Sequence, residues 1–162
     1  MDRVPWRRFQ TCVDRYLGDR NIQTFTCPDY FRVMAFVQLT YRESLRDIVA
    51  CLNAVPEKMY HMRIRSGISR NNLSNATKQR DWRIFVDFAQ VLIEQARLLY
   101  GHETKPVDID ATVYALDPTT IDLCLPLFPW APFRKTRAAI KLCALLNIQG
   151  DIPELIYISN GK

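Results

Sequence analysis

The chain has 162 residues, of which 48% are hydrophobic and 24% are charged, and it carries a formal net charge of +5. This composition is close to that of average globular domains and excludes wholesale disorder. Its long apolar runs, among them Val33–Val37 and Leu142–Leu146, reach five residues, whereas a membrane span needs about 20. The first residues also lack the apolar core of a secretory signal. We therefore expect a soluble, cytoplasmic protein.

The sequence does not indicate a zinc site, a phosphate-binding loop or a catalytic triad. Five cysteines without a Cys-x-x-Cys pair and only two histidines provide no zinc-ligand spacing. The five glycines are isolated, so no glycine-rich phosphate loop exists. His61 and His102 both precede the strand-rich part and offer no Ser-His-Asp or Cys-His arrangement. We expect reduced and mostly buried thiols.

The positive charge is concentrated toward the N-terminus. Residues 1–105 hold 17 Lys and Arg against 11 Asp and Glu, whereas residues 106–162 hold 5 against 6. From Lys58 to Arg80 six basic residues occur without a single acid. Such a stretch is typical of contact with a polyanion, so Lys58–Arg80 is the first candidate for a nucleic-acid contact.

The first hundred residues predict a helical bundle. Apolar residues recur at helical spacing, and capping residues precede several of the segments. Ser44 and Asp47 form a capping box, and Ser69 is the expected N-cap of a short polar helix. Helices are expected from about Trp6 to Leu17, from Pro28 to Leu39, from Leu45 to the residue before Pro56, from Ser69 to about Arg80, and from Trp82 to Tyr100.

Residues 101–106 predict a domain boundary, with a helical domain over 1–105 and a second domain over 106–162. Beyond it the apolar period falls from 3.6 to 2, which indicates strands. Three strands are expected, the first over Val113–Leu116 and Thr120–Leu125, the second over Ala138–Ile148 and the third over Ile152–Ser159. An irregular proline-containing loop is expected after the first strand, and a turn at residues 149–151. Because so few strands are rarely stable as an independent domain, we expect residues 107–162 to be the N-terminal part of a larger domain.

Asp117 is the candidate metal ligand. It follows the short apolar strand Val113–Leu116, and an acid held rigidly at a sheet suits a hard divalent cation. A turn-forming Asp before Pro118 is the alternative. Nearby, Asp108 and Asp110 are expected to solvate the entry to the strand.

Two segments can be interpreted either as nucleic-acid contacts or as ordinary structural segments. Ser69–Ala76 is polar and flanked by helices, and its Arg, Asn and Ser side chains can read base edges and grip phosphates, as in a helix-turn-helix. The same residues also suit a solvated helix face. The loop Phe128–Arg137 interleaves aromatic residues with three cations, which suits either a strand-gripping loop or a hydrophobic plug with a basic end.

Several stretches resemble bacterial insertion-sequence DDE transposases of the insertion-sequence-four group. The segments Ala115–Leu125, Leu127–Ala131 and Phe133–Thr136 are similar to the start of the catalytic domain. Upstream, the chain resembles the helical domain of unknown function that precedes it. The matching pieces there are Phe25–Cys27, Gln38–Thr40, Ser44–Ile48 and Ile68 through Ala76 to Asp81.

The resemblance implies an α+β chain in which the helical bundle is followed by the first three strands of an incomplete ribonuclease-H-like domain. Family members carry two Asp and one Glu around two Mg²⁺ or Mn²⁺ ions for phosphodiester cleavage and strand transfer. Asp117 matches the first Asp. The helical part would hold transposon-end DNA in the bacterial cytoplasm, with a second copy or a full-length transposase as a further partner.

The chain departs from the family at three positions. It has Pro118 where Ser is usual, Cys143 where His is usual and Asn160 where Asp is usual. The second Asp and the Glu lie beyond residue 162, so we expect no catalysis and no metal binding by this chain alone. A DNA-binding or inhibitory fragment and a plain helical interaction domain are the alternatives. The candidate DNA contacts are Lys58, Arg63, Arg65, Arg70, Asn71, Lys78, Arg80, Arg134, Lys135 and Arg137.

Overall fold

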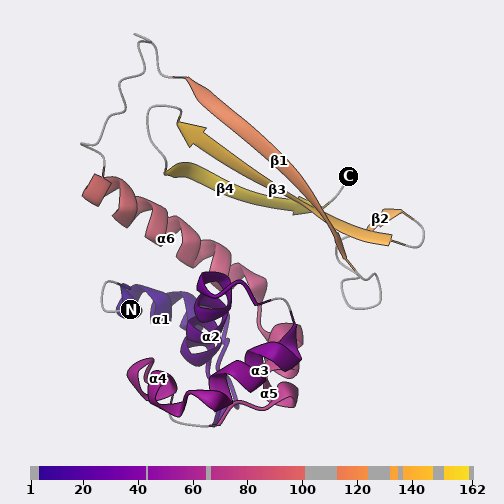
Figure 1. The fold of residues 1–162 in the computed structure, drawn as a ribbon. Coiled ribbons are helices and arrows are strands. Elements are labelled where there is room, and N and C mark those ends of the chain that lie inside the picture. The colour runs from indigo at the N-terminus through magenta and orange to yellow at the C-terminus, as the bar shows by residue number, and fades with distance from the viewer. Residues whose placement is uncertain are drawn as a thin grey trace. The chain divides into compact units, whose positions relative to one another are not determined.

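The computed structural model describes residues 4–42, 44–64, 67–100, 113–123, 132–134, 137–147 and 152–160. The chain is an α+β protein in which helices precede an antiparallel sheet, as the sequence predicts (Figure 1). It divides into two compact units, Met1–Phe85 and Val86–Lys162. This division falls within the last helix, before the boundary expected at residues 105 and 106. Each unit is described by itself.

The expected helices are present, and one more lies between them. The helices are α1 (Trp6–Arg15), α2 (Cys27–Leu39), α3 (Leu45–Ala54), α4 (Pro56–His61), α5 (Arg70–Gln79) and α6 (Trp82–Tyr100). The additional helix α4 overlaps the start of the basic stretch, and its six residues are too few to give a clear apolar period. His61 ends it and is exposed.

Local capping chemistry sets where the helices begin. Ser44 Oγ accepts a hydrogen bond from the backbone N–H of Asp47 at 3.1 Å, and Ser69 Oγ accepts one from Asn72 at the same distance. Both confirm predicted N-caps, and each satisfies a donor that the first turn leaves without a helical partner. Asp81 caps α6 in the same way, because its Oδ1 accepts from the N–H of Arg83 at 2.9 Å.

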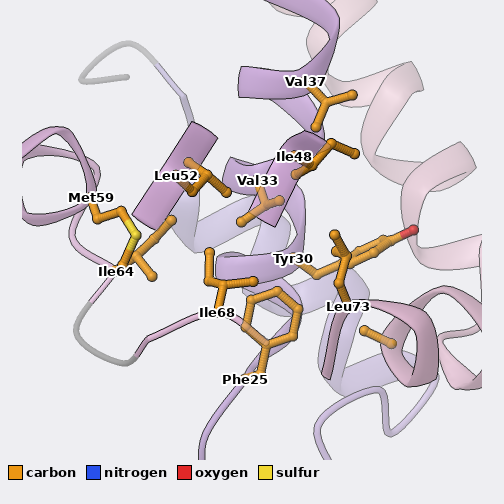
Figure 2. Packing of buried hydrophobic residues seen from close by; sticks show 11 residues of the cluster. Phe25, Tyr30, Val33, Val37, Ile48, Leu52, Met59, Ile64, Ile68 and Leu73 are labelled. Carbon is orange, nitrogen blue, oxygen red and sulfur yellow. The ribbon is translucent and has the colours of Figure 1, made fainter. Parts of the chain in front are cut away.

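An apolar cluster holds α2, α3, α4 and α5 together. Val33 and Val37 of α2 meet Ile48 and Leu52 of α3, and Leu73 of α5 closes the cluster from a third side (Figure 2). The cluster members are Phe25, Tyr30, Val33, Val37, Ile48, Leu52, Met59, Ile64, Ile68, Leu73 and Ala76, all at most 9% exposed. Burial of each large apolar side chain contributes about 1.5–3 kcal/mol.

Gly18 lies where the chain leaves α1 and has no room for a side chain. A Cβ atom there would come within 2.5 Å of Ile84 Cδ1 and 3.0 Å of Cys27 Sγ. Both of those residues are fully buried, so neither can move into solvent. The tight packing therefore requires glycine at this position.

Replacing this glycine tests that packing. We expect Gly18→Ala to lower the free energy of unfolding by about 1–3 kcal/mol, because the added methyl overpacks a closed site. Gly67→Ala is the matched control, since no atom lies within 4 Å of a Cβ at Gly67. Chemical denaturation of both variants measures the difference, and equal stabilities would contradict this account of Gly18.

The second unit contains an antiparallel sheet. Its strands are β1 (Tyr114–Leu123), β2 (Pro132–Arg134), β3 (Arg137–Asn147) and β4 (Pro153–Asn160). The long strand β3 pairs with both β1 and β4, and the short β2 joins it near Ala138 (Figure 1). Within this unit, Gln90 of α6 donates from Nε2 to the carbonyl oxygen of Ile156 at 2.8 Å, and Arg97 pairs with Glu154 at 3.5 Å.

The three expected strands are present, and one prediction about the loop is corrected. The segments expected as strand before and after Asp117 are joined through Asp117 and Pro118 into one continuous β1, and part of the expected loop forms the short additional strand β2. Pro118 fits inside β1 because, among the described strands, β1 pairs only with β3 and has an unpaired edge. A proline is tolerated on an edge strand when its missing N–H would face outward. The expected turn at residues 149–151 lies outside the described residues.

Candidate nucleic-acid interface

The helix α5 presents a polar row to solvent because two apolar residues fix its rotation. Leu73 and Ala76 are buried in the core cluster at 0% and 3% exposure. Asn71, Asn75 and Lys78 follow one another at spacings of four and three residues, which places them in one row along the helix. All three are exposed. The row therefore lies on the side of α5 away from the core.

Further polar residues flank this row. Arg70, Asn72 and Gln79 are exposed on the same helix. The sequence predictions included Arg70, Asn71 and Lys78 but missed Asn72, Asn75 and Gln79. The positions of Leu73 and Ala76 in the sequence could have predicted these three residues. Residues on the side of a half-buried helix opposite its apolar residues face water. The exposed face of α5 thus offers amides and cations over its whole length.

Of the remaining candidates, Lys58 belongs to α4 and Arg63 follows the end of that helix. Arg63 is exposed, whereas Arg65 and the side chain of Lys58 lie outside what the structure describes. Arg63 has φ of 60°, the left-handed conformation. Its N–H donates to the carbonyl oxygen of Tyr60 at 2.8 Å, and Ile64 N–H donates to that of Met59 at 2.9 Å. This pair of bonds is a Schellman motif, in which Arg63 occupies the position that glycine favours.

The two roles of Arg63 can be separated by one substitution. We expect Arg63→Gly to raise the free energy of unfolding by about 1 kcal/mol, because glycine adopts a left-handed backbone without the steric penalty of a Cβ. The same variant loses a cation, so its affinity for DNA is expected to fall if Arg63 contacts phosphate. Thermal denaturation measures the change in stability of this variant, and DNA titration measures its affinity for DNA. A loss of stability would contradict the expected gain from glycine at the left-handed position.

Arg80 lies in the interior, unlike the other described cations of the stretch. Its side chain is 6% exposed. Nη1 donates to the carbonyl oxygen of Gly18 at 3.3 Å, Nη2 donates to that of Phe25 at 2.5 Å, and Asp19 Oδ1 lies 4.0 Å away. These contacts occupy the guanidinium within the fold, so we leave Arg80 out of the proposed DNA-contacting surface.

The Arg80 site also sets the chemistry of a neighbouring cysteine. Asp19 Oδ1 accepts a hydrogen bond from the backbone N–H of Cys27 at 2.7 Å, so one carboxylate links Arg80 to the start of α2. Burial, reinforced by Asp19, raises the pKa of the Cys27 thiol to about 12. Cys27 therefore stays protonated at neutral pH and is a packing residue rather than a nucleophile. Cys12 is likewise buried, whereas Cys51 and Cys143 are half-buried, so two of the four described cysteines fit the expectation of buried thiols.

The buried position of Arg80 predicts a large effect on stability. We expect Arg80→Ala to lower the free energy of unfolding by about 2–4 kcal/mol, because it leaves buried carbonyl oxygens and Asp19 without their donor. Lys78→Ala is the matched control on the same helix. Lys78 is exposed, so its replacement is expected to change stability by less than about 0.5 kcal/mol. Urea titrations compare the two, and similar losses would refute the interior role of Arg80.

The other expected site residues lie in the sheet. Arg134 and Arg137 are paired in the register of β2 and β3, and Lys135 lies outside the described residues. Asp117 lies in the middle of β1, paired with Ala144 of β3, and is exposed. The alternative interpretation of Asp117 as a turn residue is therefore wrong, because Asp117 lies within a continuous strand. Asp108 and Asp110 lie outside the described part of the chain.

The described residues do not assemble a metal centre. Among them, no three His, Cys, Asp or Glu side chains gather closely enough to hold an ion. Among the described side chains, Asp117 therefore has no partner carboxylates of the kind that a two-metal site requires. Nor does any helix that the structure describes combine the length and apolarity needed to cross a membrane.

Comparison with known proteins gives a match for the N-terminal part of the chain. Residues 1–65 match the family model described as "Domain of unknown function (DUF4372)", a domain found in transposase-like proteins. The match covers α1 to α4 and ends before α5 begins. The comparison with curated proteins gives no match, and neither does the comparison with solved structures.

Proposed function

We propose that the helical unit of this chain binds duplex DNA through α5, as the N-terminal part of a DNA transposase that holds transposon ends. The observation that carries the proposal is the exposed row of Asn71, Asn75 and Lys78, held outward by the burial of Leu73 and Ala76. Asn can form a bidentate pair with adenine in the major groove, and Lys can contact guanine or phosphate. At ten residues, or about 15 Å, α5 is short enough to lie in that groove.

The charge around α5 supports the same surface. Arg63, Arg70 and Lys78 are exposed, and no acid occurs from Lys58 to Arg80. A stretch of exposed cations without acids favours approach to phosphates of any DNA sequence, because each contact releases condensed counterions. Base contacts by the two asparagines would then supply the sequence preference.

Three findings support placing this DNA binding in a transposase. The match of residues 1–65 to a domain found in transposase-like proteins agrees with the resemblance of the upstream segments. The segment from Ala115 to Thr136 resembles the start of the DDE catalytic domain. In the sheet, β3 lies between β1 and β4 and pairs antiparallel with both. This arrangement agrees with the first three strands of the ribonuclease-H-like domain that the resemblance implies. Asp117 would be the first catalytic carboxylate, but the described residues do not complete a metal site, so we derive no catalytic step.

A salt titration tests the proposed DNA binding. We expect the logarithm of affinity for duplex DNA to fall with the logarithm of salt concentration, with a slope of about −0.9 for each phosphate contact. Lys78→Ala and Arg70→Ala should each make that slope shallower by about one contact. Arg7→Ala is the control, since Arg7 is an exposed arginine on α1. Fluorescence anisotropy measures all four proteins, and absence of binding at low salt would refute the proposal.

The asparagines are tested separately on selected sequences. A randomised duplex pool first identifies the preferred sequence of the wild-type chain. Asn71→Ala and Asn75→Ala should then reduce discrimination by about 1–3 kcal/mol at one base pair each while leaving the salt slope unchanged. If both variants keep the sequence preference of the wild type, the two asparagines do not contact bases, and α5 binds DNA through phosphate contacts alone.

A further inference from the structure

A pocket of about 410 Å³ lies between α2 and the segment where α5 ends and α6 begins. Phe31, Met34 and Ala35 of α2 line one side of it, and Trp82 and Phe85 of α6 line another. We call it the α2 pocket, and all of its lining residues belong to the first compact unit. Small-molecule sites have volumes of about 300–1,000 Å³ and are lined mainly by apolar and aromatic side chains. The α2 pocket therefore has the size and the lining of a site for a small aromatic ligand.

Aromatic contacts hold the walls of the α2 pocket in place. The ring of Phe31 packs against the rings of Trp6 and Phe9, with centroid distances of 6.0 and 5.2 Å. The ring of Phe85 packs against that of Tyr30, with the centroids 5.6 Å apart. A ligand that enters a site with walls already held in this way orders few side chains on binding, which favours affinity. The rings also favour a flat aromatic ligand, since aromatic rings attract one another when offset-stacked or edge to face.

Among the described residues that line the pocket, one polar side chain is open to a ligand. Thr77 Oγ1 donates to the carbonyl oxygen of Leu73 at 2.9 Å and accepts from the hydroxyl of Tyr30 at 3.4 Å. Arg80 directs both Nη atoms to carbonyl oxygens elsewhere in the fold, and its Nε is buried. By contrast, Gln38 is exposed, and no described residue hydrogen-bonds with its amide. This amide offers a donor and an acceptor side by side.

These polar groups decide which aromatic ligand suits the pocket. The described lining contains no acid, and the guanidinium of Arg80 is already bound within the fold. A charged ligand would therefore lose hydration without gaining a partner, which favours an uncharged one. The free amide of Gln38 matches a ring edge that carries a donor beside an acceptor. The adenine ring has such an edge, and a glutamine amide can pair with it through two hydrogen bonds.

We propose that the α2 pocket binds an uncharged, planar heteroaromatic ring of the adenine type, with the ring against Phe31 and Trp82 and its polar edge on the amide of Gln38. Such a ring has two sources, a free adenine nucleoside and an unpaired adenine base of DNA, and the chemistry of recognition is the same for both. The proposal concerns the ring alone, so it does not depend on DNA binding by α5.

Nuclear magnetic resonance of the full chain tests the proposal with adenosine as the probe. We expect adenosine to shift the indole N–H signal of Trp82, which Trp82→Phe identifies. Gln38→Leu should raise the dissociation constant of adenosine about tenfold, because it removes both hydrogen-bond partners of the ring edge. Gln23→Leu is the matched control, since Gln23 is exposed and does not line the pocket. A dissociation constant that Gln38→Leu leaves unchanged, or that Gln23→Leu raises equally, would overturn the proposal.

A second probe separates the polar contact from simple apolar binding. N-methylindole has a flat aromatic ring of similar size without a hydrogen-bond donor or acceptor on its edge. Its affinity should stay the same in Gln38→Leu, because the ring contacts are unchanged. An equal loss of affinity for both probes would show that Gln38→Leu disturbs the pocket itself, and would overturn the role of the amide.

A larger side chain inside the pocket gives an independent readout. Ala35→Phe should abolish the shift that adenosine causes, because the new ring would fill the space of the ligand. Ala50→Phe is the matched control, since Ala50 is exposed on α3. Circular dichroism checks that both variants are folded. Binding that persists in Ala35→Phe, or that is lost equally in both folded variants, would overturn the assignment of the site.

Two duplexes distinguish the sources of the ring. If the ring comes from DNA, a duplex with one unpaired adenine should shift the Trp82 signal further than the same duplex fully paired. Equal shifts with both duplexes would exclude DNA as the source and leave the free nucleoside. If neither adenosine nor the unpaired adenine changes the Trp82 signal, the proposal is wrong, whatever the outcome for α5.

Discussion

The helical unit depends on the buried guanidinium of Arg80. It joins the C-terminal end of α5 to the segment between α1 and α2, through the carbonyl oxygens of Gly18 and Phe25 and the carboxylate of Asp19. Asp19 in turn accepts from the first N–H of α2. Three helices are thus tied by one planar group with several donors, a geometry that lysine cannot reproduce. Its low exposure means that water does not compete for these contacts.

Because Arg80 fixes one end of α5 and the apolar pair Leu73 and Ala76 fixes its rotation, the polar row on the opposite side is held rigidly. Ser69 fixes the other end by capping the helix. A binding surface on a helix held at both ends loses little conformational entropy on binding. The same stretch of sequence therefore supplies both the anchor of the helix and the side chains proposed to meet DNA.

The helix α2 packs on two sides within the helical unit. One side contributes Val33 and Val37 to the apolar cluster, and on another side Phe31 contacts Trp6 and Phe9 of α1. The sheet, with Asp117 exposed in mid-strand, contributes no assembled chemistry among the described residues.

The sequence by itself determined the helix starts at Ser44 and Ser69, the long α6 and the change from helices to strands. These depend on neighbours a few residues apart, so local patterns carry them. Only the tertiary structure decided that Arg80 turns inward while Lys78 faces water, since the partners of Arg80 lie 55 and 62 residues away in the chain. It likewise placed Pro118 inside a strand, because the edge position of β1 tolerates what local propensity disfavours.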